Sequence, residues 1–541
     1  MRLNTRRDFD VIILGSGVAG SMLGAILARQ GFAVLILDSG VHPRFAVGES
    51  TIPQTSQLIT LLGREYDVPE LHFLGLGSPR LLREHVTRNC GIKRVFGFVY
   101  HRPGVEHDPN EAHQFGNVWR DENHFFRQDI DAYLLTTAIR YGAHAVQGIR
   151  VESIVVGDDG VEVVASGDRY TGRFVADGTG YKSVVADRFH VREEPCSLVA
   201  RTRSIFTHMV DVKPFEDVAP SRMAHRWSQA TLHHCFKRGW IWVIPFNNWD
   251  GAPNPLVSVG ATVDERLHPE DPSASPEEEF AGFVEMFPAV SRQFATARLA
   301  RPWVRTRRLQ YFSTRTTGYR WALLSHAAGF IDPLFSRGLV NTVDSLRSLS
   351  KAIIAALRDD DFSESRFDRI DREQKRNITF ADKIVAGSYI AWDDFELWNA
   401  WLRLWAVGVH DTESRLGSVI MMGEHSPVRP TIDPIASEYE GPQYRALFEE
   451  MWSVITRYDA GTMTLDQARG GLWRAVQSYE FSMPLPDGVK GHEWAMTHPQ
   501  CRDLYLGIGE RHERWVKRLP DAHLAEHERA GAPVVARRAL R

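Results

Sequence analysis

A glycine-rich turn between two apolar runs restricts the fold of this chain more than any other feature of its sequence. The mostly apolar run 9–14 leads directly into Gly15-Ser16-Gly17-Val18-Ala19-Gly20. Residues 21–30 have a helix-compatible composition and end at Gly31, after which a second apolar run covers 33–37. A strand, a Gly-x-Gly-x-x-Gly turn, a helix and a second strand within about thirty residues predict a dinucleotide-binding βαβ unit.

The glycines of this turn have a physical purpose. Glycine permits the tight turn and the close approach of the backbone to a pyrophosphate, and the helix that follows offers free N–H groups to it. Asp38, at the end of the second apolar run, stands where a carboxylate would bind a ribose hydroxyl. The alternative is a coincidental glycine turn. The predicted cofactor contacts in this unit are Gly15, Gly17, Val18, Ala19, Gly20 and Asp38.

Composition excludes several classes of protein. The 541 residues carry a net charge of -4 and are 43% hydrophobic, which is typical of a large globular protein and argues against nucleic-acid binding. The four cysteines form no Cys-x-x-Cys pair, so neither a zinc site nor a disulfide framework is expected. We expect no metal, no signal peptide and no membrane-spanning helix, and we therefore expect a cytoplasmic protein.

The remaining segments predict an α/β core followed by helices. Residues 150–156 and 161–165 flank Asp158-Asp159-Gly160, a hairpin signal, and a strand at 174–176 runs into a glycine turn at 177–180. Further strands are expected at 256–261 and from Trp321. Helical periodicity dominates later, at 346–357, 368–389, 391–405, 444–458 and 466–479. We expect a core over 1–355, with a second sheet inserted at about 190–310, and a mainly helical region over 356–541 that frays from Ala530 onward.

One strand-like segment carries an unusual pair of tryptophans, Trp240-Ile241-Trp242-Val243-Ile244-Pro245. Side chains alternate along a strand, so Trp240 and Trp242 point to the same face, and Pro245 cannot continue a sheet ladder. A buried core strand is the simpler interpretation, because large aromatic side chains dominate cores. The single glycine turn and the Trp-x-Trp-x-Ile-Pro segment together resemble the flavin-dependent halogenases, whose mark is this pair of motifs.

Three further segments extend the resemblance over residues 9–340. Val47-Gly48-Glu49-Ser50-Thr51-Ile52-Pro53 resembles the Gly-Glu-Ser turn of these enzymes, and Phe126-Arg127-Gln128-Asp129-Ile130-Asp131 resembles the Arg-x-x-x-Asp motif of flavin monooxygenases. The segment 329–338 resembles the late flavin motif. The resemblance implies an FAD-binding Rossmann-like monooxygenase fold with a mixed or antiparallel sheet on the substrate side. It adds these cofactor contacts: Ser39, Arg44, Gly48, Glu49, Ser50, Arg127, Asp332 and Gly338.

The resemblance also implies a reaction. Reduced FAD and dioxygen give a flavin C4a-hydroperoxide, which a halide held near Ser336, Arg337 and Gly338 attacks to form hypohalous acid. A separate flavin reductase supplies FADH2, because the chain has one dinucleotide fingerprint. The partition between flavin and substrate comprises Trp240, Trp242 and Pro245.

A lysine beyond the tryptophans directs the acid, and Lys93 is the candidate. It lies in the mostly apolar segment 90–100, where burial would lower the pKa of its amine. The alternatives are that Lys93 ends a strand with its head in water, or that Lys182 or Lys237 takes the role. A general base stays unassigned among His101, His113 and Glu49.

One departure from the family pattern concerns the substrate. Tryptophan halogenases read Pro-Leu-Glu-Ser-x-Gly in the late motif, whereas this chain has Phe335 at the glutamate position. The resemblance therefore favours the branch that acts on phenols and pyrroles, in particular the chlorinases of tetracycline-type polyketides, with a substrate that is free or tethered to a carrier protein. The halide could be chloride or bromide. The alternatives are an NADPH-driven aromatic hydroxylase and a non-catalytic FAD-binding scaffold.

Overall fold

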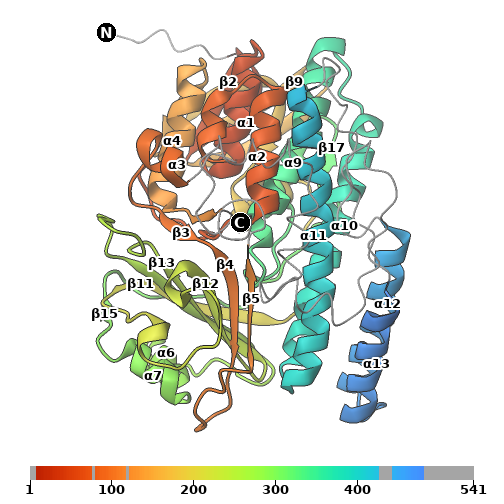
Figure 1. The fold of residues 1–541 in the computed structure, drawn as a ribbon. Helices are drawn as coiled ribbons and strands as arrows, with labels where there is room; N and C mark the ends of the chain where they lie inside the picture. The colour runs from red at the N-terminus through yellow and green to blue at the C-terminus, as the bar shows by residue number, and fades with distance from the viewer. Residues whose placement is uncertain (1–7, 76–78, 117–120, 426–440, 480–541) are drawn as a thin grey trace.

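The computed structural model describes residues 8–75, 79–116, 121–425 and 441–479, and the predicted fraying after Ala530 lies outside these ranges (Figure 1). A first sheet has the order β17-β18-β10-β1-β2-β7, and β8 and β9 extend it beside β10. The five strands from β18 to β7 run parallel. Its strands are β1 (Asp8–Leu14), β2 (Val34–Asp38), β7 (His144–Gln147), β8 (Val151–Gly157), β9 (Gly160–Ala165), β10 (Asp168–Asp177), β17 (Thr317–Gly318) and β18 (Trp321–Leu323).

The predicted βαβ opening is confirmed as β1, α1 (Val18–Arg29) and β2. β1 lies between β10 and β2, which explains why its side chains are apolar on both faces. The predicted hairpin is present as β8 and β9. Helices α2 (Pro53–Glu65), α4 (Arg127–Arg140) and α9 (Arg337–Asp359) pack with α1 on one face of this sheet.

A second, mixed sheet has the order β15-β11-β14-β13-β12-β4-β5, with β16 beside β11. All its pairs are antiparallel except β12 with β4. The sheet also contains β4 and β5, which precede the predicted insertion at 190–310. Its strands are β4 (Val95–Tyr100), β5 (Ala112–Gly116), β11 (Thr202–Val210), β12 (Ala230–Phe236), β13 (Gly239–Pro245), β14 (Val257–Asp264), β15 (Arg298–Leu299) and β16 (Val304–Arg305).

The second sheet is buried on both faces. One face packs on α6 (Pro276–Glu285) and α7 (Pro288–Phe294), through side chains such as Ile241 and Val243. The other face carries Trp240 and Trp242 and joins the main core. A short two-stranded ladder, β3 (Gly91–Lys93) with β6 (Glu122–His124), lies at the edge of this face.

The C-terminal part is helical and covers one side of the molecule, opposite α6 and α7 (Figure 1). Its helices are α10 (Glu364–Ala391), α11 (Phe395–His425), α12 (Pro442–Asp459) and α13 (Leu465–Ser478). The helix predicted at 391–405 is wrong at its start, because α10 continues to Ala391 and a turn precedes α11. In that turn Asp394 accepts the backbone N–H groups of Glu396 and Leu397, which starts a new helix. The expected division at 355/356 falls inside α9.

Candidate active site

The nucleotide cradle lies in the turn between β1 and α1. Gly15 has φ +89°, and a Cβ on Gly20 would come within 1.9 Å of the carbonyl oxygen of Gly15. Gly17 is the N-cap residue of α1 and has no side chain to cap it, so no capping side chain satisfies the first N–H groups of the helix. Val18 and Ala19 supply the next two of these groups. The backbone is therefore shaped to receive a phosphate, as the sequence predicts.

The end of β2 provides charged groups beside this cradle. One oxygen of Asp38 accepts both the N–H and the hydroxyl of Ser16, each at 2.6 Å, and also Nη2 of Arg44 at 3.1 Å. Among the described residues, Nε of Arg44 is buried without a hydrogen-bond partner. Asp38, Ser39 and Arg44 line a cleft of about 1580 Å³ that Gly15 also borders. An unpartnered cationic nitrogen in a cleft of this size fits the adenosine and phosphate portion of FAD.

A second loop approaches the cradle from the segment before α2. Arg127 forms a two-pronged ion pair with Asp131, at 2.7 and 3.0 Å. Its Nη1 also donates to the carbonyl oxygens of Val47, at 2.5 Å, and Gly48, at 3.2 Å. Gly48 has φ +89°, which favours glycine. Arg127 thus fixes the Gly48–Glu49–Ser50 loop, and its predicted contact with the flavin stays a prediction.

The segment 329–338, which resembles the late flavin motif, leads into the N-terminus of α9. Ser336 is the N-cap residue of α9 and has φ +53°. Its side chain forms no hydrogen bond with the first N–H groups of the helix as the structure describes it. The N–H groups of Arg337 and Gly338 belong to the first turn of this 23-residue helix. A Cβ on Gly338 would lie 2.9 Å from Nε2 of His326, a buried nitrogen without a partner among the described residues. The positive end of α9 and an open imidazole therefore meet at the segment predicted to bind halide and flavin.

Trp240 and Trp242 lie on one face of β13, with ring centroids 5.6 Å apart. Trp242 packs beside Phe206, which stacks on Phe45 in the loop before Gly48. Trp240 packs instead on His233, at 4.9 Å. The two indoles thus connect the loop before Gly48 to the side chains around His233, and their role as a partition stays a prediction.

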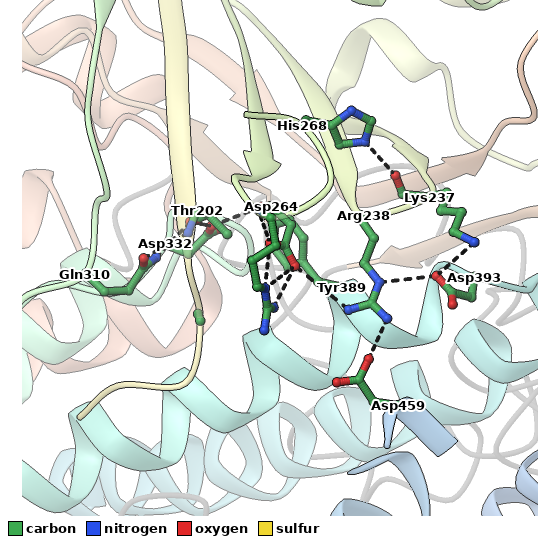
Figure 2. Close-up of polar contacts among 12 residues, drawn as sticks. Thr202, Lys237, Arg238, Asp264, His268, Gln310, Asp332, Tyr389, Asp393 and Asp459 are labelled. Atoms are coloured by element: carbon green, nitrogen blue, oxygen red, sulfur yellow. Dashed lines mark hydrogen bonds and ion pairs between the residues drawn. The ribbon is translucent and has the colours of Figure 1, made fainter. Parts of the chain in front are cut away.

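A buried polar network holds Trp240 in place, and Figure 2 shows its members Thr202, Asp332 and Tyr389. The indole N–H of Trp240 donates to the Tyr389 hydroxyl at 2.9 Å, and that hydroxyl donates to Asp332 at 3.0 Å. The hydroxyl of Thr202 donates to the same Asp332 oxygen at 2.7 Å. Burial raises the pKa of Asp332 to about 6. Asp332, predicted as a cofactor contact, therefore connects β11, α10 and the tryptophan strand through its side chain.

An ion-pair cluster ties the turn before Trp240 to the helical region (Figure 2). Arg238 lies between β12 and β13 and pairs with Asp459 at 2.6 Å, Asp393 at 3.2 Å and Asp264 at 3.8 Å. Lys237 is exposed and lies 3.9 Å from Asp393. The helical region therefore positions the tryptophan strand, and Lys237 lies at the surface rather than inside the site.

Lys93 ends β3 with its side chain fully buried. Its amine donates to Oγ of Ser50 at 2.9 Å and to the carbonyl oxygen of Thr51 at 2.7 Å. The amine also lies 3.9 Å from the ring centroid of Phe96. Burial lowers the pKa of Lys93 well below its ordinary value, as the sequence predicts. Ser50 thus contacts the lysine, and its predicted contact with the cofactor stays a prediction.

The buried carboxyl group of Glu122 accompanies the lysine, that of Glu413 lies near Glu122, and sequence reasoning missed both. Glu122 faces Lys93 across the β3–β6 ladder and accepts the hydroxyls of Thr51 at 2.7 Å and Ser56 at 2.6 Å. Glu413 lies on α11, where burial, and secondarily the charge of Glu122, raise its pKa to about 8. Only the pairing of β3 with β6 brings the first carboxyl to the lysine, so no local sequence signal could have found it.

Aromatic side chains fill the space around Phe96. His233 lies 4.7 Å from Phe96 and 4.6 Å from Phe98, on the same face as Trp240. Phe335 stacks on Trp405 of α11 at 4.8 Å and 17°, and it meets Phe98 edge-on at 6.2 Å. The position that carries glutamate in tryptophan halogenases is therefore the centre of an apolar cluster.

The other candidates from the sequence have different surroundings, and of them His113 lies beside Phe115, which packs on Trp405 of the aromatic cluster. His101 hydrogen-bonds His234 at 2.9 Å and packs against Phe287 and Phe215, on the far face of the second sheet. His113 stacks on Phe395, and Glu49 binds Nε2 of His208 at 2.8 Å. Lys182 lines the nucleotide cleft. The structure places Lys93 alone, of the three candidate lysines, beside the aromatic cluster.

The tryptophan halogenase family model matches residues 10–75 and 109–404. The chain belongs to this family of flavin-dependent halogenases. It is 42% identical over 537 residues to tetracycline 7-halogenase of Kitasatospora aureofaciens, covering 93% of this chain and 96% of that one. It is 41% identical over 498 residues to monodechloroaminopyrrolnitrin halogenase of Pseudomonas fluorescens, covering 88% and 86%.

Solved halogenases have the same architecture. The halogenase PltM, crystallised with phloroglucinol and FAD, superimposes with a TM-score of 0.83 at 35% identity, covering 87% of this chain and 96% of that one. The protein is an FADH2-dependent halogenase of aromatic substrates that uses FAD, a halide ion and dioxygen. Lys93 lies in the gap between the two matched ranges, so the family match leaves its role open. No helix among the described residues is long and apolar enough to span a membrane.

Proposed function

We propose that this halogenase chlorinates an electron-rich, phenolic ring of a natural-product intermediate, with Lys93 directing hypohalous acid to the ring. One observation carries the proposal. A fully buried amine lies 3.9 Å from an aromatic ring, inside an aromatic cluster where Phe335 replaces a carboxylate. A phenol is activated by its own hydroxyl group, so it needs less help in losing its ring proton. Two relatives support this class, tetracycline 7-halogenase and PltM with its bound phloroglucinol.

The residues present would have the following roles. The glycine turn and Arg44 would hold reduced FAD, which when bound would activate dioxygen, the oxidant that converts halide to hypohalous acid. The N-terminus of α9, at Ser336, Arg337 and Gly338, holds the halide as an anion. Trp240, Trp242 and Pro245 keep substrate and flavin apart. A separate flavin reductase supplies FADH2.

Lys93 acts on the electrophile. Its amine hydrogen-bonds hypohalous acid or carries the halogen as a chloramine, and either form aims the halogen at one ring carbon. From hypohalous acid, the C–Cl bond forms as the O–Cl bond breaks, and the hydroxide leaves with the ring proton as water. Formation of the chloramine has already released that water, so from the chloramine the C–Cl bond forms as the N–Cl bond breaks, and the ring proton returns to the amine of Lys93. A lowered pKa favours the neutral amine, which is the reactive form.

The test is the variant Lys93→Met, assayed with a flavin reductase, FAD, NADH, dioxygen, chloride and a panel of free phenols, pyrroles and tryptophan, with products read by mass spectrometry. We expect FAD binding to persist and chlorination to fall by at least about 100-fold. Lys237→Met removes an exposed lysine and is the matched control, with unchanged activity. Chlorination by Lys93→Met at the rate of the unmodified protein would disprove the assignment. Hydroxylated product driven by NADPH alone would instead support the hydroxylase alternative.

A further inference from the structure

A continuous chain of buried hydrogen bonds joins Lys93 to the end of the tryptophan strand. The amine of Lys93 lies 2.9 Å from Oγ of Ser50, and that oxygen lies 2.7 Å from Oγ1 of Thr231. Oγ1 of Thr231 lies 3.1 Å from Nε2 of His124. Nδ1 of His124 lies 2.9 Å from the carbonyl oxygen of Pro245. All four side chains are buried, and they come from four separate segments of the chain.

The chemistry of the end groups fixes the direction of every hydrogen bond. A carbonyl oxygen only accepts, so Nδ1 of His124 carries a proton and donates it to Pro245. Burial lowers the pKa of His124 to about 3, so the ring is neutral and Nε2 is an acceptor. Thr231 must therefore donate to His124, and Ser50 must donate to Thr231. Ser50 Oγ is then left to accept from Lys93.

This direction constrains the lysine amine. Ser50 can present only its lone pair to Lys93, and the carbonyl oxygen of Thr51 is also only an acceptor. The amine therefore donates in two fixed directions, whichever protonation state it has. Without the hydrogen bonds to Thr231 and His124, the Ser50 hydroxyl could rotate and present its proton to the amine of Lys93 instead.

We propose that His124 and Thr231 are positioning residues that orient the amine of Lys93 through Ser50, with Pro245 as the anchor. The inference rests on the proposed role of Lys93. It assigns a second purpose to the tryptophan segment. Its indoles separate flavin from substrate, and the carbonyl group at its end sets the geometry of the lysine. The same strand thus fixes the path of hypohalous acid and the group that receives it.

The variant Thr231→Val tests this series of hydrogen bonds. Valine keeps the shape of the buried strand residue and removes only the hydroxyl group. We expect the kcat of chlorination to fall about tenfold, which corresponds to about 1.4 kcal/mol, with KM unchanged. FAD binding and the amount of hypohalous acid captured by monochlorodimedone should stay the same. Thr231→Ser restores the hydroxyl and should return kcat to within about twofold. A merely structural role would lower captured acid and product together.

A second measurement does not depend on chlorination. With histidines labelled by ¹⁵N, we expect the His124 ring to be neutral and protonated at Nδ1 from pH 5 to 8, and Thr231→Val to alter its Nε2 shift. A protonated His124 ring at pH 7, or a neutral ring with its proton on Nε2, would refute the proposed direction of the hydrogen bonds. If Thr231→Val chlorinates at the full rate while Lys93→Met does not chlorinate, the positioning role is refuted and the proposed function is not. An active Lys93→Met would refute the proposed function, and the positioning role with it.

Discussion

Replacing Phe335 by glutamate restores the carboxyl group that tryptophan halogenases carry at this position, and the structure predicts a large loss of stability. Phe335 is 1% exposed, and its ring contacts Trp405 and Phe98. Losing the aromatic contacts costs about 3 kcal/mol. Burying a carboxyl group without a partner costs about 2 kcal/mol more. The sum, about 5 kcal/mol, approaches the whole stability of many proteins.

Phe335→Leu is the matched control, because it removes the ring but keeps an apolar side chain, at a cost of about 1.5 kcal/mol. Urea unfolding followed by tryptophan fluorescence measures both variants. Burial raises the pKa of the new carboxyl group, so its stabilising contribution is present below the pKa of an unfolded glutamate and is lost as pH rises through the folded value. The gap between the two variants should therefore widen from pH 5 to pH 8.

The activity of the glutamate variant gives a third readout. We expect no activity on tryptophan, because the aromatic cluster around Phe335 excludes the position that the carboxylate takes in tryptophan halogenases. A gap between the glutamate and leucine variants below about 1 kcal/mol at pH 8, or one that does not change with pH, would refute this reasoning, since it would mean that water or a polar partner reaches position 335.

Two further predictions concern the cofactor cradle and buried acids. Gly20→Ala should abolish FAD binding, measured by flavin fluorescence, because its Cβ would lie 1.9 Å from a carbonyl oxygen, whereas Gly282→Ala meets nothing within 4 Å and should bind normally. Burial raises the pKa of Asp382 to about 6 from 3.8, so up to about 3 kcal/mol of stability is present below pH 4 and is lost as pH rises through 6. Asp382→Asn should flatten the measured pH dependence of unfolding, and an unchanged curve would contradict the assignment.

Local patterns account for most of the fold and for the cofactor side. The glycine turn, the hairpin at Asp158-Asp159-Gly160 and most of the helices are set by residues close in sequence, and all appear where the pattern predicts them. The start of α11 was missed, because the helical periodicity runs through the turn that Asp394 caps. Composition could not indicate that β4 and β5 join the second sheet, since this pairing links strands over 100 residues apart.

The sequence by itself determined a dinucleotide-binding unit, a paired-indole strand and a lysine in an apolar segment. These are local properties, because glycine conformation, strand alternation and the cost of burying an amine depend on neighbours along the chain. The tertiary structure alone decided what surrounds the lysine. Glu122, His124 and Thr231 approach Lys93 only when β6 and β12 pair with their partners, and α11 adds Trp405 behind Phe335. Long-range pairing therefore set the direction of the lysine amine, which residue identity alone left open.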